Sequence, residues 1–376
     1  MLTLSACGSS TASAGISSHE ALPLPQPAES LSKALATAAA GVHTPGAQAS
    51  VLVCGQPYWA GSTGVTIKGT HDLVTNATRF VLASTTKTIT ATMIMSLVEK
   101  GRLSLQAPLS AFYPGLPDAK RITVQMLLNM TSGLPEYFDN PTIANIINNE
   151  PAHHWTRTEL INALATMKPV FVPGTRYSYT DSNYVVLGGI IEKKTGMSID
   201  AYFRNVIAGP AGMASSTFIY DPKNSGLFAH PYDEAQNGTL FDQFVPGIGI
   251  AADFWGEVWT DGGLASTASD LSRFGSALFA GKLVGKATLA TMTVMGRYDY
   301  GLGVFDENID GHRWLGHNGA YSGFESEDWT DPQRMVTIAV TTNVMEPDNA
   351  NYAASDVVLQ ALVKAYDKLQ PVGTCT

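Results

Sequence analysis

A serine and a lysine lie three residues apart in the stretch Ser84-Thr85-Thr86-Lys87. If a helix begins here, this spacing places the hydroxyl and the amine on one face of it. A serine hydroxyl becomes a nucleophile when a neighbouring base takes its proton, and a desolvated lysine can be that base because burial lowers its pKa. The stretch therefore indicates covalent acyl transfer; the alternative is a chance match at a solvated helix start.

The composition is that of a globular protein, with 376 residues of which 45% are hydrophobic and 15% charged. This length predicts two domains, or one domain with an inserted subdomain. A net charge of −9 without a Lys/Arg cluster argues against nucleic acid as a partner. The sequence has no HExxH motif, and His153-His154 lacks metal-ligand spacing, so we expect no metal and no other cofactor. We expect a monomer that acts on a small-molecule or peptide substrate.

Residues 1–27 are rich in Ser, Ala and Pro, which is typical of a flexible tether. Within them, Leu4-Ser5-Ala6-Cys7 resembles the lipobox of bacterial lipoproteins, in which the cysteine is lipidated. A secretory signal needs a basic segment and about 7–15 apolar residues, whereas only six residues precede Cys7. Either the start lies upstream or the match is chance, and the adjoining tether favours the first. We therefore expect an exported protein: an envelope lipoprotein attached to the membrane through Cys7, or a periplasmic or secreted one.

The other two cysteines, Cys54 and Cys375, stand at the end of a predicted strand and at the end of the chain. They are either two idle thiols or, in an exported protein, a disulfide pair. A bridge would tie the C-terminus to the sheet, and such bridges contribute about 2–4 kcal/mol.

The periodicity of apolar residues predicts strands at both ends of the chain and helices in its middle. Because strands from both ends must form one sheet, we expect an α+β fold: an antiparallel sheet covered by N- and C-terminal helices, with a large, mainly helical insert. Residues 28–101 and 291–372 would form the α/β sheet subdomain and residues 102–290 the helical one. The site would lie between them, where such pockets form. The predicted strands are 47–54, 58–66, 79–83, 313–317, 324–329 and 335–342, and the clearest helices are 28–40, 85–100, 183–194, 268–280 and 351–368.

Several phrases downstream of Ser84 occur in a specific order. Residues 127–135 resemble LLxxTSGLP, residues 173–188 resemble PGxxFxYSNxNYxxLG, and residues 261–271 resemble AGGLxSTAxDL. With Tyr300-Gly301-Leu302-Gly303 and Gly316-His317-Asn318-Gly319, this set resembles the serine β-lactamase and penicillin-binding superfamily. The branch is the class C type, which includes D-Ala-D-Ala carboxypeptidases and β-lactamase-like esterases.

The resemblance implies roles for individual residues. Ser84 would be the nucleophile, Lys87 its proton acceptor, and Tyr179 a phenol that relays a proton to the leaving group or shares the base role. His317 and Gly319 match the Lys/His-Thr-Gly motif of an edge strand, in which Asn318 replaces the threonine and keeps an amide donor. The backbone N–H groups of Ser84 and Ala320 would form the oxyanion hole, one of them at a helix N-terminus that favours negative charge.

Two departures from the family pattern affect the expected substrate. Asp181 stands where asparagine is common, and an ionised carboxylate cannot donate to an acylamino carbonyl. It could instead pair with Lys87, hold it charged and raise its pKa. His317 replaces lysine and gives less positive charge at neutral pH, so a substrate carboxylate would be bound weakly or by Arg297 or Arg313.

These residues predict an exported serine hydrolase that works through an acyl-enzyme. We place D-Ala-D-Ala carboxypeptidase-like activity on cell-wall peptide, or on related D-amino-acid and ester substrates, slightly ahead of carboxylesterase activity. Efficient β-lactamase activity ranks low because of Asp181 and His317. The alternative from another class is a catalytically weak penicillin-binding module of the envelope.

Overall fold

The computed structural model describes residues 26–150, 153–219, 228–245, 249–250, 258–346, 353–369 and 375. Its centre is a six-stranded antiparallel sheet with the strand order β10-β11-β12-β13-β1-β2. The first and last strands of the chain meet in its middle, where Ala47 of β1 pairs with Thr342 of β13. The sheet strands are β1 (Gly46–Val53), β2 (Gln56–Gly64), β10 (Phe305–Ile309), β11 (His312–Tyr321), β12 (Phe324–Asp331) and β13 (Val336–Thr342).

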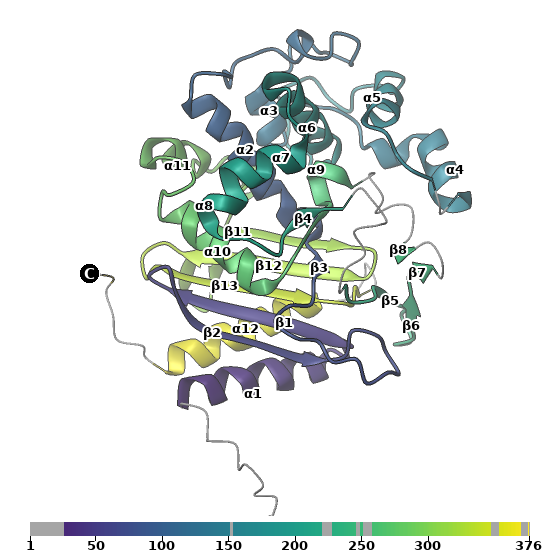
Figure 1. Ribbon diagram of the computed structural model, residues 1–376. Helices are drawn as coiled ribbons and strands as arrows, with labels where there is room; N and C mark the ends of the chain where they lie inside the picture. Colours follow the sequence, from purple (N-terminus) through teal and green to yellow (C-terminus); the bar gives the residue numbers. More distant parts are fainter. Residues whose placement is uncertain are drawn as a thin grey trace, which may run out of the picture.

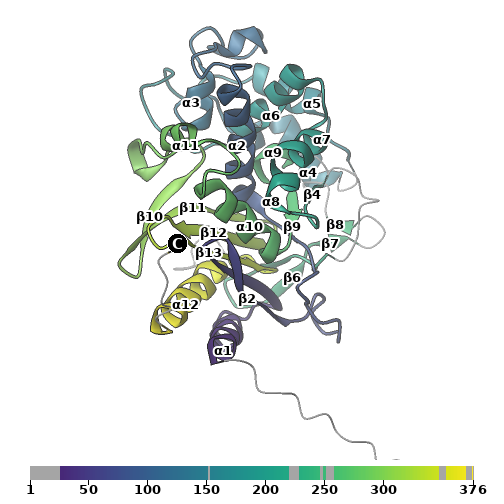
Figure 2. The same cartoon turned by 60° about the vertical axis from the view of Figure 1, so that its left-hand side comes forward.

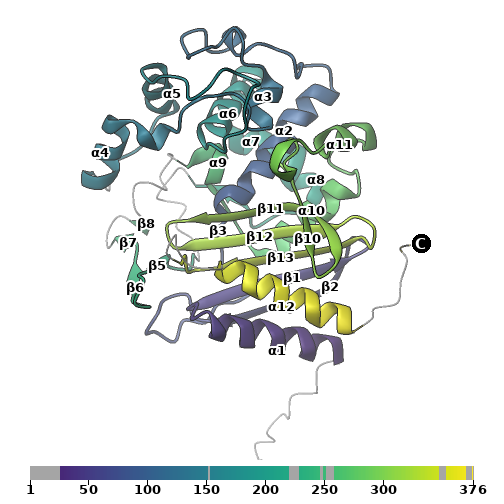
Figure 3. The ribbon, with the colours of Figure 1, turned by 180° about the vertical axis from the view of Figure 1, so that it is seen from behind.

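The terminal helices α1 (Gln26–Gly41) and α12 (Ala354–Lys368) pack side by side on one face of the sheet (Figure 1, Figure 3). Alternate residues of β1, Ala47, Ala49 and Val51, join the apolar cluster of these helices. The residues between them point the other way: Ser50 accepts a 2.9 Å hydrogen bond from Ser272 of α10 (Ala268–Phe279). This two-residue period explains why β1 is buried on both faces. The predicted fold class is confirmed.

Helix α10 lies in the segment that the sequence placed in the helical subdomain, yet it packs on β1, β12 and β13 (Figure 2). It covers the face of the sheet opposite α1 and α12. Its amphipathic pattern gave no information on which partner its apolar face would contact. The other helices are α3 (Val124–Leu128), α4 (Pro141–Asn149), α5 (Arg157–Ala165), α6 (Ser182–Thr195), α7 (Ile199–Phe203), α8 (Gly209–Ala211), α9 (Trp259–Gly262) and α11 (Lys286–Met292).

Helix α2 (Thr86–Glu99) is the central helix of the molecule, because every residue from Thr86 to Leu97 is buried. A helix buried on all sides is typical of the middle of a large core. It contacts α6 and α9 and starts next to the sheet. A short sheet of order β3-β9-β4 leads into it: β3 (Phe80–Val81) pairs with β9 (Leu264–Ser266), which pairs with β4 (Thr217–Phe218). The remaining short strands are β5 (Tyr232–Glu234), β6 (Leu240–Asp242), β7 (Phe244–Val245) and β8 (Gly249–Ile250).

A disulfide joins Cys54 to Cys375 across 321 residues, with their Cα atoms 5.4 Å apart. It ties the end of the chain to the β1–β2 hairpin, so of the two alternatives for these cysteines the disulfide pair is the one observed. Cys7 and most of the predicted tether lie outside the described residues. Among the helices of the described part, none is long and apolar enough to cross a membrane.

Candidate active site

Ser84 lies in a tight 3-10 turn, Ala83–Thr85, between strand β3 and the first residue of α2. The preceding residue, Ala83, has a positive φ of 46°, which is uncommon for a residue other than glycine. Backbone strain of this kind persists where the surroundings enforce it and occurs often at functional sites. The turn leaves Ser84 half-buried beside the N-terminus of α2, and the helix dipole at this end favours negative charge.

Lys87, the second residue of α2, is fully buried, and its ammonium group has three partners. Nζ donates to Ser84 Oγ at 2.9 Å and to the backbone oxygen of Asp261 at 2.9 Å. It also forms an ion pair with Asp181 Oδ1 at 2.5 Å. Burial acts to lower the pKa of Lys87, but the negative charges of Asp181 and Asp261 and the Tyr179 phenol raise it above its usual value. Lys87 is therefore a cation in the resting site, and the predicted pair with Asp181 is present.

Tyr179 covers the open side of this group, with 37% of its surface exposed. Lys87 Nζ lies 5.0 Å from the centre of its ring. Burial of the phenol raises the pKa of Tyr179 to about 12, although Lys87 acts in the opposite direction. At neutral pH the phenol keeps its proton, so Tyr179 is equipped to give a proton rather than to take one.

His317 is buried on β11, where the Tyr300 hydroxyl lies 3.4 Å from its Nε2. Burial and the nearby charge of Lys87 lower the pKa of His317 to about 3, so the ring is neutral. The sequence predicted a weak positive charge at His317, whereas the buried ring carries none at neutral pH. Of the two arginines considered for a substrate carboxylate, Arg313 is bound to Asp306 at 2.8 Å on the far part of the sheet edge. Arg297 has no such partner among the described residues.

Strand β11 runs directly against the nucleophile turn. A Cβ atom at Gly319 would lie 2.3 Å from the Leu82 oxygen and 2.7 Å from the Ser84 nitrogen, so only glycine fits. The last pair between β10 and β11 is Phe305 with Gly316. From residue 317 onward, β11 pairs with β12 on one side only. Its other side, where β10 ends, has no strand partner in the described part of the chain, which leaves backbone groups available for a substrate. Asn318 and Ala320 are exposed on this edge, on either side of Gly319.

Two further carboxyl groups near Lys87 were missed by the sequence reasoning. Glu136 accepts a 2.8 Å hydrogen bond from the backbone of Asp181, and burial together with the Asp181 charge raises the pKa of Glu136 to about 7. Asp261 accepts from the Tyr137 hydroxyl at 3.3 Å, and its pKa is raised by burial and by Asp181. A signal existed for Asp261, because it stands where the family pattern AGGLxSTAxDL has alanine.

Tyrosine rings continue from the site toward α11. Tyr300 lies 6.3 Å from Tyr179 and 6.0 Å from Tyr177, and Tyr177 lies 4.9 Å from Tyr298. Tyr298 is 73% exposed and has a φ of 59°. A cavity of about 270 Å³ adjoins this row, and its lining includes Tyr177, Val294, Met295, Arg297, Tyr300 and Leu302. The described residues include no group of three His, Cys, Asp or Glu side chains that could hold a metal ion.

Comparison with known sequences gives a consistent set of relatives. The model of the Beta-lactamase family matches residues 31–362. A penicillin-binding protein from Bacillus subtilis (strain 168) is 30% identical over 265 residues, covering 66% of this chain and 56% of that protein. A D-aminopeptidase from Cereibacter sphaeroides is 24% identical over 85% of this chain and 60% of its own. An esterase from Burkholderia gladioli is 32% identical over 42% and 43%. The chain thus spans 43 to 60% of the length of these relatives.

Solved structures agree with the sequence relatives. A D-stereospecific amidohydrolase from a Streptomyces species superposes with a TM-score of 0.72 and 26% identity, over 89% of this chain and 97% of that one. A D-amino acid amidase from Ochrobactrum anthropi SV3, solved with L-phenylalanine, gives a TM-score of 0.78 at 20% identity, over 91% and 99%. The second similarity shows the fold, an antiparallel sheet with terminal helices and a helical insert.

Proposed function

Because this chain belongs to the beta-lactamase family, whose model spans residues 31–362, we propose that it is a serine hydrolase that forms an acyl-enzyme at Ser84. The observation that carries this proposal is the 2.9 Å hydrogen bond between Lys87 Nζ and Ser84 Oγ. The close approach of Gly319 to the Ser84 amide supports it. A nucleophile, a proton carrier and oxyanion donors within reach of one carbonyl group are what acyl transfer requires.

The proposed reaction has two steps. Ser84 Oγ bonds to the substrate carbonyl carbon while its proton moves to neutral Lys87, and the carbonyl oxygen becomes an oxyanion held by the N–H groups of Ser84 and Ala320. The Tyr179 phenol gives its proton to the leaving nitrogen as the C–N bond breaks, and Lys87 returns a proton to Tyr179. Water then attacks the Ser84 ester and releases the acid. Since Lys87 is a cation at rest, it must lose a proton first.

We propose amide bonds of D-amino-acid residues as the substrate class, with D-Ala-D-Ala carboxypeptidase-like cleavage of cell-wall peptide as one member. The D-stereospecific amidohydrolase at 26% identity and the D-aminopeptidase support a D-configured residue. The 270 Å³ cavity is lined by Val294, Met295 and Leu302 as well as by Arg297, so it suits a side chain that is mainly apolar. Export and membrane attachment through Cys7 remain part of this proposal.

Two alternative functions have their own support. The neutral His317 removes a cation that a substrate carboxylate would use, which favours an ester substrate over a peptide with a free C-terminus. The ion pair of Lys87 with Asp181 holds the general base in its charged form, which favours a weakly catalytic binding module. Such a module would be acylated by reactive compounds but would turn over slowly.

Turnover of matched substrates separates these functions. The D- and L-enantiomers of alanine p-nitroanilide, an acetylated D-Ala-D-Ala peptide and p-nitrophenyl acetate would be assayed with the wild-type chain and Ser84→Ala. We expect hydrolysis that depends on Ser84 and prefers the D-anilide over the L-anilide by more than about tenfold, or ~1.4 kcal/mol. Turnover of the ester alone supports the esterase, and no Ser84-dependent turnover of any substrate refutes the hydrolase.

A further inference from the structure

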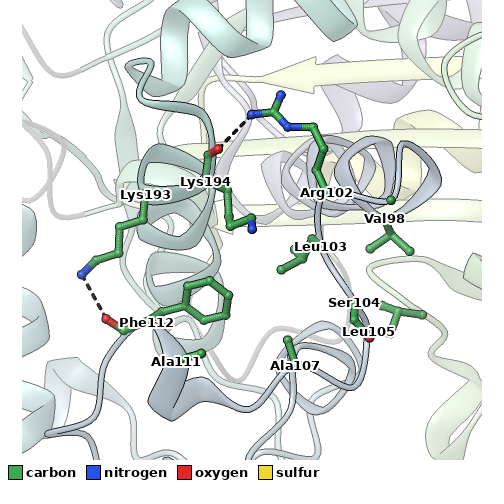
Figure 4. A pocket seen from close by; sticks show the side chains of 11 residues that line it. Val98, Arg102, Leu103, Ser104, Leu105, Ala107, Ala111, Phe112, Lys193 and Lys194 are labelled. Atoms are coloured by element: carbon green, nitrogen blue, oxygen red, sulfur yellow. Dashed lines mark hydrogen bonds between the residues drawn. The ribbon is translucent and has the colours of Figure 1, made fainter.

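A second cavity lies away from Ser84, at the opposite ends of the two helices that carry the site. Helix α2 begins beside Ser84 and ends at Glu99; helix α6 follows Asp181 and ends at Thr195. Their C-terminal ends border a cavity of about 930 Å³ (Figure 4). At 1.5 Å per residue, the 14 residues of α2 place this cavity about 20 Å from the nucleophile.

The rim of the cavity carries three cations and no acid. Arg102, Lys193 and Lys194 line it, although acidic residues outnumber basic ones 32 to 23 in the whole chain. Arg102 donates to the Lys194 backbone oxygen at 2.9 Å and Lys193 to the Phe112 backbone oxygen at 3.0 Å, so both side chains are held in place. Figure 4 shows the Lys194 side chain pointing into the space between Arg102 and Phe112.

The nearest acids along the chain are turned away from the cavity. Glu99 accepts hydrogen bonds from the Gly285 amide at 2.7 Å and the Thr288 hydroxyl at 2.9 Å. Glu192 accepts from the Ile199 amide at 3.2 Å and lies 3.7 Å from Arg157. The three cations are therefore not neutralised by these carboxylates.

Helix dipoles account for only part of this charge. Each helix C-terminus carries about half a negative elementary charge, and lysines in the last turn stabilise it. Two such ends balance about one of the three positive charges. An excess of about two remains around the cavity, and that is an environment that attracts an anion.

The floor of the cavity is apolar. Val98, Leu103, Leu105, Ala107, Ala111 and Phe112 line it, and Figure 4 shows the Phe112 ring facing Leu103 across the space. Cations above an apolar floor match a molecule with an anionic head and a hydrocarbon part. We propose that this cavity binds an anionic amphiphile, with its phosphate or carboxylate at Arg102 and Lys194 and its chain over Leu103, Leu105 and Phe112.

The test uses dodecyl phosphate below its micelle concentration, with inorganic phosphate and dodecyl maltoside as probes of head and chain alone. Binding is measured by calorimetry on the full chain carrying Ser84→Ala, so that the result is independent of the proposed hydrolase activity. The variants are Arg102→Gln with Lys194→Gln, Ala111→Trp to fill the cavity, and Lys100→Gln as a matched control. Lys100 is an exposed cation at the same helix end that does not line the cavity.

We expect dodecyl phosphate to bind more tightly than either partial probe. Its affinity should fall about tenfold for each rim charge removed (~1.4 kcal/mol). Binding to Ala111→Trp should not be measurable, and the affinity of Lys100→Gln should equal that of the parent chain. Additional recruitment to phosphatidylglycerol vesicles but not phosphatidylcholine vesicles identifies a membrane lipid as the source; its absence identifies a free amphiphile. No binding of dodecyl phosphate, or equal weakening by Lys100→Gln, overturns the proposal.

Discussion

The ion pair with Asp181 keeps Lys87 protonated, so it should limit activity at neutral pH. The Asp181→Asn variant should therefore be more active. Lys87 Nζ and Asp181 Oδ1 are 2.5 Å apart, and two unit charges even about 4 Å apart interact by about 4 kcal/mol at an effective dielectric constant of about 20. This corresponds to about three pKa units, so the pKa of Lys87 should fall by about that amount in the variant. Neutral lysine then becomes about 1,000-fold more abundant but is a weaker base. With a Brønsted coefficient of about 0.5, kcat/KM should rise about 30-fold.

Asparagine at position 181 should add a second effect that depends on the substrate. Its amide can donate to an acylamino carbonyl, which the carboxylate cannot, and a neutral hydrogen bond contributes about 1 kcal/mol, or about fivefold. The assay compares kcat/KM for an N-acetylated D-alanine thioester and for p-nitrophenyl acetate across pH. Both should improve, the acylamino substrate more. The Asp72→Asn variant of an exposed residue is the control. No improvement of either substrate at any pH would refute the reasoning.

Three further outcomes follow from the structure. Gly319→Ala should lower kcat about 10²–10³-fold, without loss of the circular dichroism spectrum, because its methyl group would displace the nucleophile turn. Burial raises the pKa of Glu325 to about 9 and of Glu327 to about 8 from 4.5; the folded state then binds more protons, so calorimetry should show Tm falling as pH rises from about 5 to 9. Glu327→Gln should reduce that slope; an unchanged slope contradicts it. Cys54→Ser should lower the free energy of unfolding by about 2–4 kcal/mol in denaturant titrations, and a reductant should have no further effect on that variant.

The sequence predicted those residues of the site that belong to short family motifs. Ser84 and Lys87 are close because one helical turn separates them, and the order of phrases placed Tyr179 and His317 beside them. The three-dimensional neighbours of Lys87 could not be found in the same way. Asp261 reaches Lys87 from 174 residues away, and Glu136 reaches Asp181 from 45. Glu136 lies in none of the quoted motifs, and the motif that Asp261 begins does not indicate which residue Asp261 contacts.

The long strands and terminal helices were predictable because a period of two and an apolar stripe extend over enough residues to be recognised. Strand β3 was predicted within 79–83, whereas β4 and β9 have only two and three residues, too few to show a period. The bounds of helix α10 were predicted within two residues, and the sequence grouped it with residues 102–290, whereas in the structure it packs on β1, β12 and β13. The apolar stripe of α10 indicates that one of its faces is buried. Which element covers that face depends on how the sheet is assembled.

The central claim is that Ser84 becomes acylated. The most direct measurement is the intact mass of the protein after incubation with a fluorophosphonate and with a fluorescent penicillin, followed by peptide mapping. We expect a stoichiometric adduct on the peptide that contains Ser84, absent in Ser84→Ala and slower to form at low pH, where the neutral fraction of Lys87 falls further. No adduct with either reagent, or an equal adduct in Ser84→Ala, would contradict it.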